Sequence, residues 1–121
     1  ERCITICRTN NVQELAEYYS AADVFINPTL EDNFPTTNIE ALACGTPVVT
    51  FNTGGSVECL SPETGFIVDK HDLMGLVNAC RTVFQKGKAQ YNEKCSEHAR
   101  NKYNKYVQYL KYVDLYKELV K

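Results

Sequence analysis

Two carboxylates eight residues apart, Asp32 and Glu40, stand at the centre of this sequence. An apolar run at residues 24–26 precedes them, and a second apolar run at residues 48–51 follows them. Carboxylates accept hydrogen bonds from hydroxyl groups, and such charge-assisted bonds are roughly twice as strong as neutral ones. With the intervening loop folded back, both acids can face one crevice and bind a ligand that carries vicinal hydroxyls.

A short helix is predicted within the same stretch, over residues 37–44. Gly45 follows it as a natural C′ residue, and Pro47 stands just beyond. The first N–H groups of a helix have no partner within the helix, and they lie at the positive end of its dipole. They suit a phosphate or a sugar oxygen. The stretch therefore combines hydroxyl acceptors with a candidate anion site.

Both acids also have ordinary structural interpretations. Residues 37–40 fit the Ser/Thr-x-x-Asp/Glu pattern of a capping box, in which Glu40 only bonds back to the Thr37 backbone. Asp32 would then be a solvated loop acid. The residues alone leave these alternatives open.

The elements around this stretch alternate between strand and helix, which predicts an α/β fold with a parallel, Rossmann-like sheet flanked by helices. Apolar or alternating runs predict strands at 3–8, 24–26, 48–51 and 65–69. Helical spacing of apolar residues predicts helices at 12–22, at 37–44 and between Asp72 and Gly87. Residues 89–121 are helical by composition, with a break near 101–105. In such sheets ligands bind where strand carboxyl ends meet helix N-termini.

Composition excludes several classes of protein. A chain of 121 residues with 44% hydrophobic residues and a net charge of −2 is at most one globular domain, and it has no basic surface for nucleic acid. No apolar run approaches the roughly 20 residues that span a bilayer, and no signal peptide is visible. The six cysteines lack zinc-ligand spacing, so we expect reduced thiols and no metal. Residue 1 is not methionine, and the chain is expected to be a piece of a longer protein.

Three blocks of the sequence resemble a known family. Their order and spacing are those of the retaining glycosyltransferases of the group-1, family-4 type, and the blocks are Ala22–Pro28, Glu31–Val49 and Gly54–Glu58. The resemblance implies the GT-B fold, in which two Rossmann-like domains face each other across a cleft. The chain would be part of the C-terminal domain, with a nucleotide-sugar-binding unit at residues 1–88 and a helical C-terminal segment of the same domain at residues 89–121.

The resemblance also implies roles for individual residues. The family's pair of acids falls on Asp32 and Glu40, which would be the catalytic positions. Glu40 would hold the ribose hydroxyls of the donor, and Asp32 would contact the donor hexose unless Glu31 takes its place. The residues around the helix start that would hold the sugar and diphosphate are Asn33, Phe34, Pro35, Thr36 and Thr37. The nucleobase would lie against Asn10 and Asn11.

One departure from the family changes the expected amide pattern. The family often has glycine and leucine where this chain has Asn33, Pro35 and Thr36. Because proline has no backbone N–H, Pro35 removes one amide donor from the helix start.

The implied function is binding of the nucleotide-sugar donor in an enzyme that transfers a hexose to a polysaccharide or glycolipid acceptor. The acceptor would bind the N-terminal domain, and the Arg and Lys that neutralise the donor diphosphate would also lie upstream of residue 1. No cofactor or metal is implied. The chain alone is expected to be inactive. The implied location is cytoplasmic, with peripheral association at the inner face of the membrane as one option.

The alternative is a non-catalytic Rossmann-like module that binds a nucleotide or a protein partner. Glu40 would then only cap its helix, so its exchange for glutamine would change little.

Aromatic residues recur at threes and fours in the last helical segment, at Tyr103, Tyr106, Tyr109, Tyr112 and Tyr116, with Val113 on the same stripe. Such a stripe is typical of core packing. In the family, by contrast, the terminal helix reaches toward the N-terminal domain. Without that domain the tyrosines would be exposed or would pair with another copy. We therefore expect the chain to form a homo-oligomer.

Overall fold

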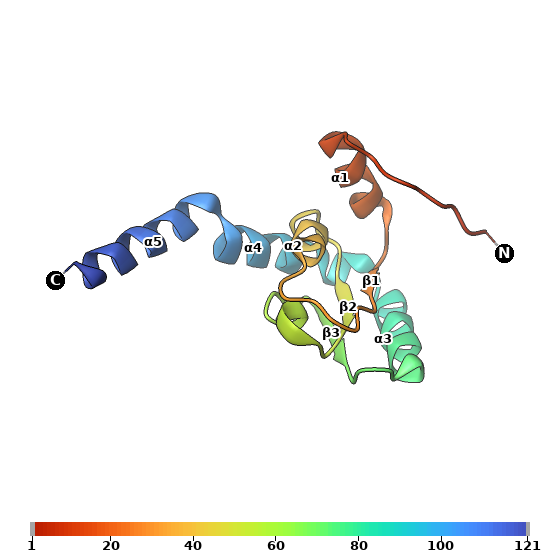
Figure 1. Ribbon diagram of the computed structural model, residues 1–121. Coiled ribbons are helices and arrows are strands. Elements are labelled where there is room, and N and C mark those ends of the chain that lie inside the picture. The colour runs from red at the N-terminus through yellow and green to blue at the C-terminus, as the bar shows by residue number, and fades with distance from the viewer. Residues whose placement is uncertain (1, 121) are drawn as a thin grey trace.

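The computed structural model describes residues 2–120, in which a small sheet lies between helices (Figure 1). The elements in chain order are α1 (Val12–Ala21), β1 (Phe25–Asn27), α2 (Thr36–Ala43), β2 (Val48–Phe51), the 3-10 turn η1 (Gly54–Val57), β3 (Gly65–Val68), α3 (Leu73–Lys86), the 3-10 turn η2 (Lys88–Gln90), α4 (Asn92–Tyr103) and α5 (Lys105–Leu119). This alternation confirms the predicted α/β fold with a helical C-terminal tail.

The three strands form a parallel sheet in the order β1-β2-β3. Phe25 pairs with Val48, and Val48 pairs with Gly65, so the three strands begin level with one another. Parallel neighbours need a crossover between them, and α2 provides it between β1 and β2. The carboxyl ends of all three strands therefore meet at one edge of the sheet.

The centre of the core is β2, whose four residues are all buried. One face of the sheet packs against α3, and the other packs against α2, which in turn contacts α4 (Figure 1). The largest fully buried apolar side chains are Leu42, Val48, Val49 and Val83. Burying a Leu or Val side chain contributes roughly 1.5–3 kcal/mol. These layers fix the strand ends from which the loops of the site emerge.

Helix boundaries in the second half of the chain follow the sequence signals. Asp72 caps α3 by accepting a 2.9 Å hydrogen bond from the Gly75 N–H, and Gly87, with φ of 86°, ends that helix. The predicted break in the last third falls at Asn104, where the backbone is extended. The Asn104 side chain accepts a 2.9 Å hydrogen bond from the Tyr106 N–H and thereby starts α5.

The predicted strand at residues 3–8 is wrong, and the sheet has three strands instead of four. Residues 2–10 have no regular secondary structure, and Ile4 is 85% exposed. A strand needs a neighbour that supplies ladder hydrogen bonds, and this segment pairs with no strand of the described sheet. An alternation of apolar and polar residues shows that a segment could join a sheet, but it does not show that a neighbouring strand is present.

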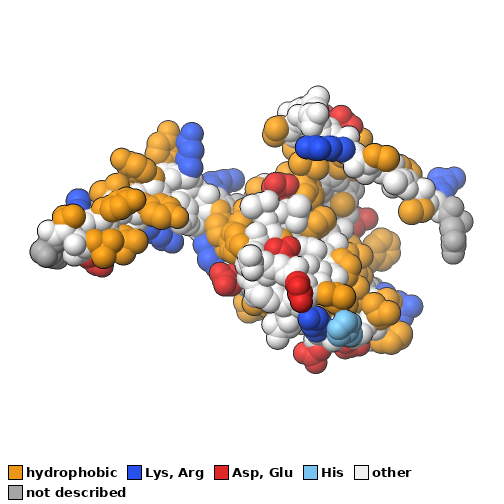
Figure 2. Space-filling view, in the orientation of Figure 1, with side chains coloured by type: hydrophobic (Ala, Val, Ile, Leu, Met, Phe, Trp, Pro, Cys, Tyr) orange, Lys and Arg blue, Asp and Glu red, His pale blue; other side chains and the backbone are white. Residues whose placement is uncertain are grey.

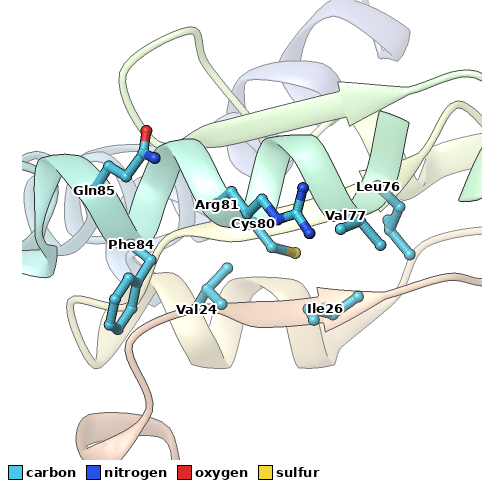
Figure 3. Close-up of a pocket in the computed structure, with 8 residues that line it drawn as sticks. All are labelled: Val24, Ile26, Leu76, Val77, Cys80, Arg81, Phe84 and Gln85. Carbon is cyan, nitrogen blue, oxygen red and sulfur yellow. The ribbon is translucent and has the colours of Figure 1, made fainter. Parts of the chain in front are cut away.

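The first strand is also less buried than its continuous apolar run predicts. Ile26 is 44% exposed, because within residues 2–120 β1 is an edge strand whose one neighbour is β2. Val24 and Ile26 line an open apolar groove of about 580 Å³, and Leu76, Cys80 and Phe84 of α3 line its other side (Figure 3).

The interpretation of the tyrosine stripe as core packing is wrong. None of the residues of α5 is buried, and Tyr106, Tyr109, Tyr112 and Tyr116 are 63–68% exposed. The helix extends away from the sheet, and apolar side chains are spread along its surface (Figure 1 and Figure 2). Only Tyr103, at the end of α4, packs against the core. The stripe stays exposed because no other element among residues 2–120 covers it.

All six cysteines are free thiols. Cys59 and Cys95 are buried in the core, whereas Cys3 and Cys7 are exposed. Within residues 2–120, no helix is long and apolar enough to cross a membrane.

Candidate functional site

A cavity of about 460 Å³ lies where the three strands end, as expected for a parallel sheet. The loop after β1 contributes Asp32 and Asn33, and the loop after β2 contributes Asn52 and Thr53. Beyond β3, Lys70 lines the same cavity. With Glu31, two carboxylates, two amides, a hydroxyl and an ammonium thus line one opening. These groups can bind the hydroxyls and the anionic groups of a polar ligand.

Asp32 is held in place by the backbone around it. Its Oδ1 accepts a 3.2 Å hydrogen bond from the Phe34 N–H, which makes a local Asx turn. Its main-chain oxygen accepts a 3.1 Å hydrogen bond from the Gly55 N–H. Asp32 is half-buried, whereas Glu31, which lines the same cavity, is exposed. Both acids therefore reach the cavity, and Asp32 is the better fixed of the two.

The glycine pair of η1 makes this arrangement possible. A Cβ on Gly54 would overlap the Asp32 carbonyl oxygen, and a Cβ on Gly55 would overlap the Asn33 carbonyl oxygen. Gly54 also has φ of 46°, a conformation that side chains disfavour. The turn after β2 can lie directly against the turn that carries Asp32 only because both residues lack a side chain.

A buried polar network ties the loops of the site together. The amide of Asn38, which has no exposed surface, donates from Nδ2 to the Ser56 carbonyl oxygen at 3.2 Å and accepts at Oδ1 from Asn27 Nδ2 at 2.8 Å. The hydroxyls of Thr50 and Ser56 are 2.7 Å apart, and Thr50 also donates to the Asn27 carbonyl oxygen at 2.9 Å. The network joins β1, α2, β2 and η1.

A second contact fixes the entrance of the loop after β1. The Thr53 hydroxyl donates to the Thr29 carbonyl oxygen at 3.0 Å, and Thr53 is buried. Sequence reasoning missed these polar groups and also missed the cavity residues Asn52 and Lys70. The available signal was Thr50, a hydroxyl within an otherwise apolar buried strand, because buried hydroxyls need a partner.

The start of α2 is open to a ligand. Pro35 is the N-cap residue, and its side chain makes no capping hydrogen bond. Thr36 and Thr37, the first two helical residues, are exposed. Because they stand in the first turn, their N–H groups have no acceptor within the helix. The helix therefore presents free amide donors beside the loop that carries Asp32.

The capping-box interpretation of residues 37–40 is wrong. Since α2 begins at Thr36, Thr37 lies within the helix and is not its cap. Glu40 is the fifth helical residue, and its Oε2 accepts a 3.0 Å hydrogen bond from the Tyr19 hydroxyl. Burial, followed by this bond to Glu40, raises the pKa of Tyr19, which keeps the hydroxyl protonated as the donor.

Glu40 and Asp32 line different cavities. The Glu40 cavity, of about 290 Å³, lies between α1 and α2, and Val12, Leu15 and Tyr19 also line it. This second cavity is mainly apolar, with the Glu40 carboxylate as its charged group. The Glu40 carboxylate thus lies beside an apolar wall, whereas the Asp32 carboxylate lies among other polar groups.

Three further predicted residues, Asn10, Asn11 and Phe34, line neither of these two cavities. Asn11 caps α1, since its Oδ1 accepts from the Gln13 N–H at 2.9 Å, and Asn10 precedes it as an exposed residue. The Phe34 ring lies 5.9 Å from the Tyr103 ring, centroid to centroid. Across residues 2–120, no group of three or more His, Cys, Asp or Glu side chains is arranged to hold a metal ion.

The family model described as "Glycosyl transferases group 1" matches residues 4–86. The chain belongs to this family. The matches to the two curated relatives named below cover only 14% and 22% of those proteins' length.

Two curated relatives are D-inositol 3-phosphate glycosyltransferases. That of Paenarthrobacter aurescens is 44% identical over 59 residues, which are 48% of this chain and 14% of the relative. That of a Mycobacterium species is 32% identical over 97 residues, which are 79% of this chain and 22% of the relative. The residues that match the family model, 4–86, include all those that line the Asp32 and Glu40 cavities.

Solved structures show that the fold is that of a GT-B glycosyltransferase domain. Sucrose-phosphate synthase from Thermosynechococcus elongatus superposes with a TM-score of 0.78 at 33% identity, over 89% of this chain and 28% of that one. The catalytic domain of starch synthase IV from Arabidopsis thaliana superposes with a TM-score of 0.56 at 20% identity, over 83% of this chain and 23% of that one, which supports the fold alone.

Proposed function

We propose that this chain supplies the nucleotide-sugar-binding part of a retaining glycosyltransferase that transfers a hexose to a polysaccharide or glycolipid acceptor. The observation that carries the proposal is the junction of the Asp32 cavity with the uncapped start of α2. It lies within the residues that match the glycosyltransferase family. Hydroxyl acceptors beside free helix amides suit a ligand that has both sugar hydroxyls and phosphates.

Each part of the donor has a candidate partner in this proposal. Asp32 accepts hydrogen bonds from the hexose, with Asn33 and Phe34 beside it, and the exposed N–H groups of Thr36 and Thr37 hold the diphosphate. Glu40 accepts hydrogen bonds from the ribose hydroxyls.

The nucleobase would lie toward the start of α1. The apolar wall of the Glu40 cavity, formed by Val12 and Leu15, suits a flat base next to a ribose. Asn10 and Asn11 stand at the end of that wall, where α1 begins.

In this mechanism the acids of the chain position the donor, and none of them attacks the sugar. Retention follows when the acceptor hydroxyl approaches the face from which the phosphate departs, and the departing phosphate oxygen takes the proton. Fixed amide donors at the diphosphate stabilise the negative charge that develops as the sugar–phosphate bond breaks. The proposal includes no metal and no cofactor.

The acceptor and its position belong to a part of the protein outside these 121 residues. We therefore propose that this chain alone has no transferase activity. The proposed location is cytoplasmic, at the inner face of a membrane where the acceptor is a glycolipid.

Glu40→Gln in the full-length protein tests the proposal. Glutamine keeps an oxygen that can accept from the Tyr19 hydroxyl, so stability should be retained. Loss of the charge should weaken donor binding about tenfold, because charge-assisted bonds are about twice as strong as neutral ones. Calorimetric titration with UDP-glucose, GDP-mannose and ADP-glucose measures the affinity, and Glu17→Gln on the exposed surface of α1 is the matched control. Unchanged affinity in Glu40→Gln would contradict the ribose role.

One observation favours a second candidate, a non-catalytic Rossmann-like module that binds a nucleotide or a partner. The Glu40 carboxylate already has an intramolecular partner, the Tyr19 hydroxyl at 3.0 Å. If that bond is its whole role, Glu40→Gln leaves nucleotide affinity unchanged and the full-length protein shows no turnover with any of the three donors.

A further inference from the structure

A second polar cavity lies at the end of the sheet opposite to the Asp32 cavity. It has a volume of about 530 Å³. Glu63 lies in the turn before β3, and Phe66 lies near the start of that strand. Lys86, at the end of α3, and Tyr91 and Lys94, at the start of α4, complete its wall. The cavity therefore belongs to the amino end of β3, whereas the proposed donor site belongs to the carboxyl ends.

The charged groups of this cavity are predominantly positive. The Lys86 ammonium lies 6.0 Å from the centroid of the Tyr91 ring. Lys94 bonds to Glu63 at 2.5 Å, and the two side chains are 53% and 63% exposed. Exposed ion pairs exchange readily with solvent, so the Lys94 ammonium can turn toward another anion. Two ammonium groups and one carboxylate thus share the opening.

Tyr91 adds an unusual feature. The residue is only 5% exposed, and its hydroxyl is buried without a hydrogen-bond partner among residues 2–120. Buried polar groups in folded proteins are almost always paired. A ligand oxygen reaches this hydroxyl only when the Tyr91 side chain turns toward the cavity, and it then gains a bond to a donor that the protein has already removed from water.

We infer that this cavity binds a small phosphate monoester that carries hydroxyl groups, of the size of a hexose phosphate. The phosphate would lie between the two ammonium groups, Lys86 and Lys94. The Gln90 amide and the Glu63 carboxylate are available for hydroxyls, and the half-buried Phe66 ring offers an apolar wall. The volume is within the usual range of small-molecule sites, roughly 300–1,000 Å³. The inference does not depend on the proposed donor site.

Calorimetric titration of the full chain with glucose 6-phosphate tests the inference, with free glucose and inorganic phosphate as comparison ligands. We expect saturable binding of glucose 6-phosphate and at least about tenfold weaker binding of either comparison ligand, because each lacks one of the two kinds of contact. Lys86→Gln should weaken binding about tenfold, since it removes a charge-assisted bond. Lys111→Gln, on the exposed surface of α5, should leave it unchanged.

Tyr91→Phe distinguishes a ligand role from a structural one. It removes the unpaired hydroxyl, so the thermal stability of the free chain should be unchanged or higher, whereas affinity for glucose 6-phosphate should fall. A stabilised variant that binds as well as the wild type would overturn the role of Tyr91.

Three results would overturn the site itself. They are no saturation up to about 10 mM, equal affinity for inorganic phosphate, and binding that persists in Lys86→Gln but disappears in Asp32→Asn.

Discussion

Two regions of the molecule contrast in what they bury. The loops at the carboxyl ends of the strands, which form a junction there, bury polar residues, whereas the helix α5 exposes apolar ones. In the junction, the polar residues Asn38, Thr50 and Ser56 have no exposed surface, and they bond to one another or to the backbone. In α5, tyrosines and leucines are exposed along the helix. The difference teaches that a residue is buried when another element packs against it, whatever its polarity. The polarity of a buried residue decides only whether it needs hydrogen-bond partners.

The largest effect should come from the contact between the two turns of the junction. In Gly55→Ala the added Cβ overlaps the Asn33 carbonyl oxygen, so the backbone must move, and we expect a loss of about 3 kcal/mol in unfolding free energy. Urea denaturation measures it. Gln13→Ala, on the exposed surface of α1, should stay within about 0.5 kcal/mol. If the unfolding free energy of Gly55→Ala differs from that of the wild type by no more than that of the control, the two turns are not in tight contact.

The polar network should follow closely. Asn38→Leu keeps the number and branching of the side-chain heavy atoms but leaves Asn27 Nδ2 and the Ser56 carbonyl oxygen without their partner. We expect a loss of about 2–3 kcal/mol in unfolding free energy, as is usual for unpaired buried groups. Asn101→Leu, on the exposed surface of α4, is the matched control. Equal unfolding free energies in the two variants would show that the network contributes no stability.

A smaller effect should appear as a pH dependence of stability that originates in the core. Burial raises the pKa of the Cys95 thiol from 9.0 to about 12. Because the folded-state pKa is the higher one, the contribution of this thiol to stability is complete below pH 9.0 and is lost as the pH rises toward 12. Cys95→Ala should therefore flatten the decline of unfolding free energy in this range, and Cys3→Ala, at an exposed position, should not. Identical alkaline slopes in all three proteins would refute the prediction.

The smallest effect on folding should come from α5. The double variant Tyr109→Ser, Tyr112→Ser should change the unfolding free energy by no more than about 0.5 kcal/mol, since both side chains are exposed. It should, however, reduce self-association of the chain, because exposed apolar stripes associate. Light scattering over a concentration series measures this. A wild-type chain that stays monomeric at high concentration would rule out a role of α5 in association.

The sequence predicted those features that depend on neighbours along the chain. The cap at Asp72, the stop at Gly87 and the break at Asn104 are local, and each is found where its residue type indicates. The same holds for β2 and β3, whose apolar runs are short and continuous. Features that depend on distant partners could not be predicted in this way. Residues 3–8 have a strand pattern but no strand beside them.

For the candidate site, the position of the Asp32 loop was predicted, but its support was not. The contact of Asn38 with Ser56 joins residues 18 apart, and that of Thr50 with Asn27 joins residues 23 apart. Glycine pairs usually mark ordinary turns, so Gly54 and Gly55 gave only a weak signal. Their value lies in the close approach to Asp32 and Asn33, which only the folded chain shows. The alternative in which Glu40 caps its helix required Thr37 as the cap residue, whereas α2 begins at Thr36 with Pro35 as its N-cap.

The edge position of β1 has a consequence for the lifetimes of its amide hydrogens. Alternate N–H groups of a strand point to opposite sides. The Phe25 N–H bonds to the Pro47 carbonyl oxygen at 2.9 Å, so that of Ile26 points away from β2. In deuterated water the Phe25 amide should exchange only when the sheet opens, whereas the Ile26 amide should exchange without such opening. Two consecutive residues of one strand would thus report separately on global opening and on solvent access at the edge.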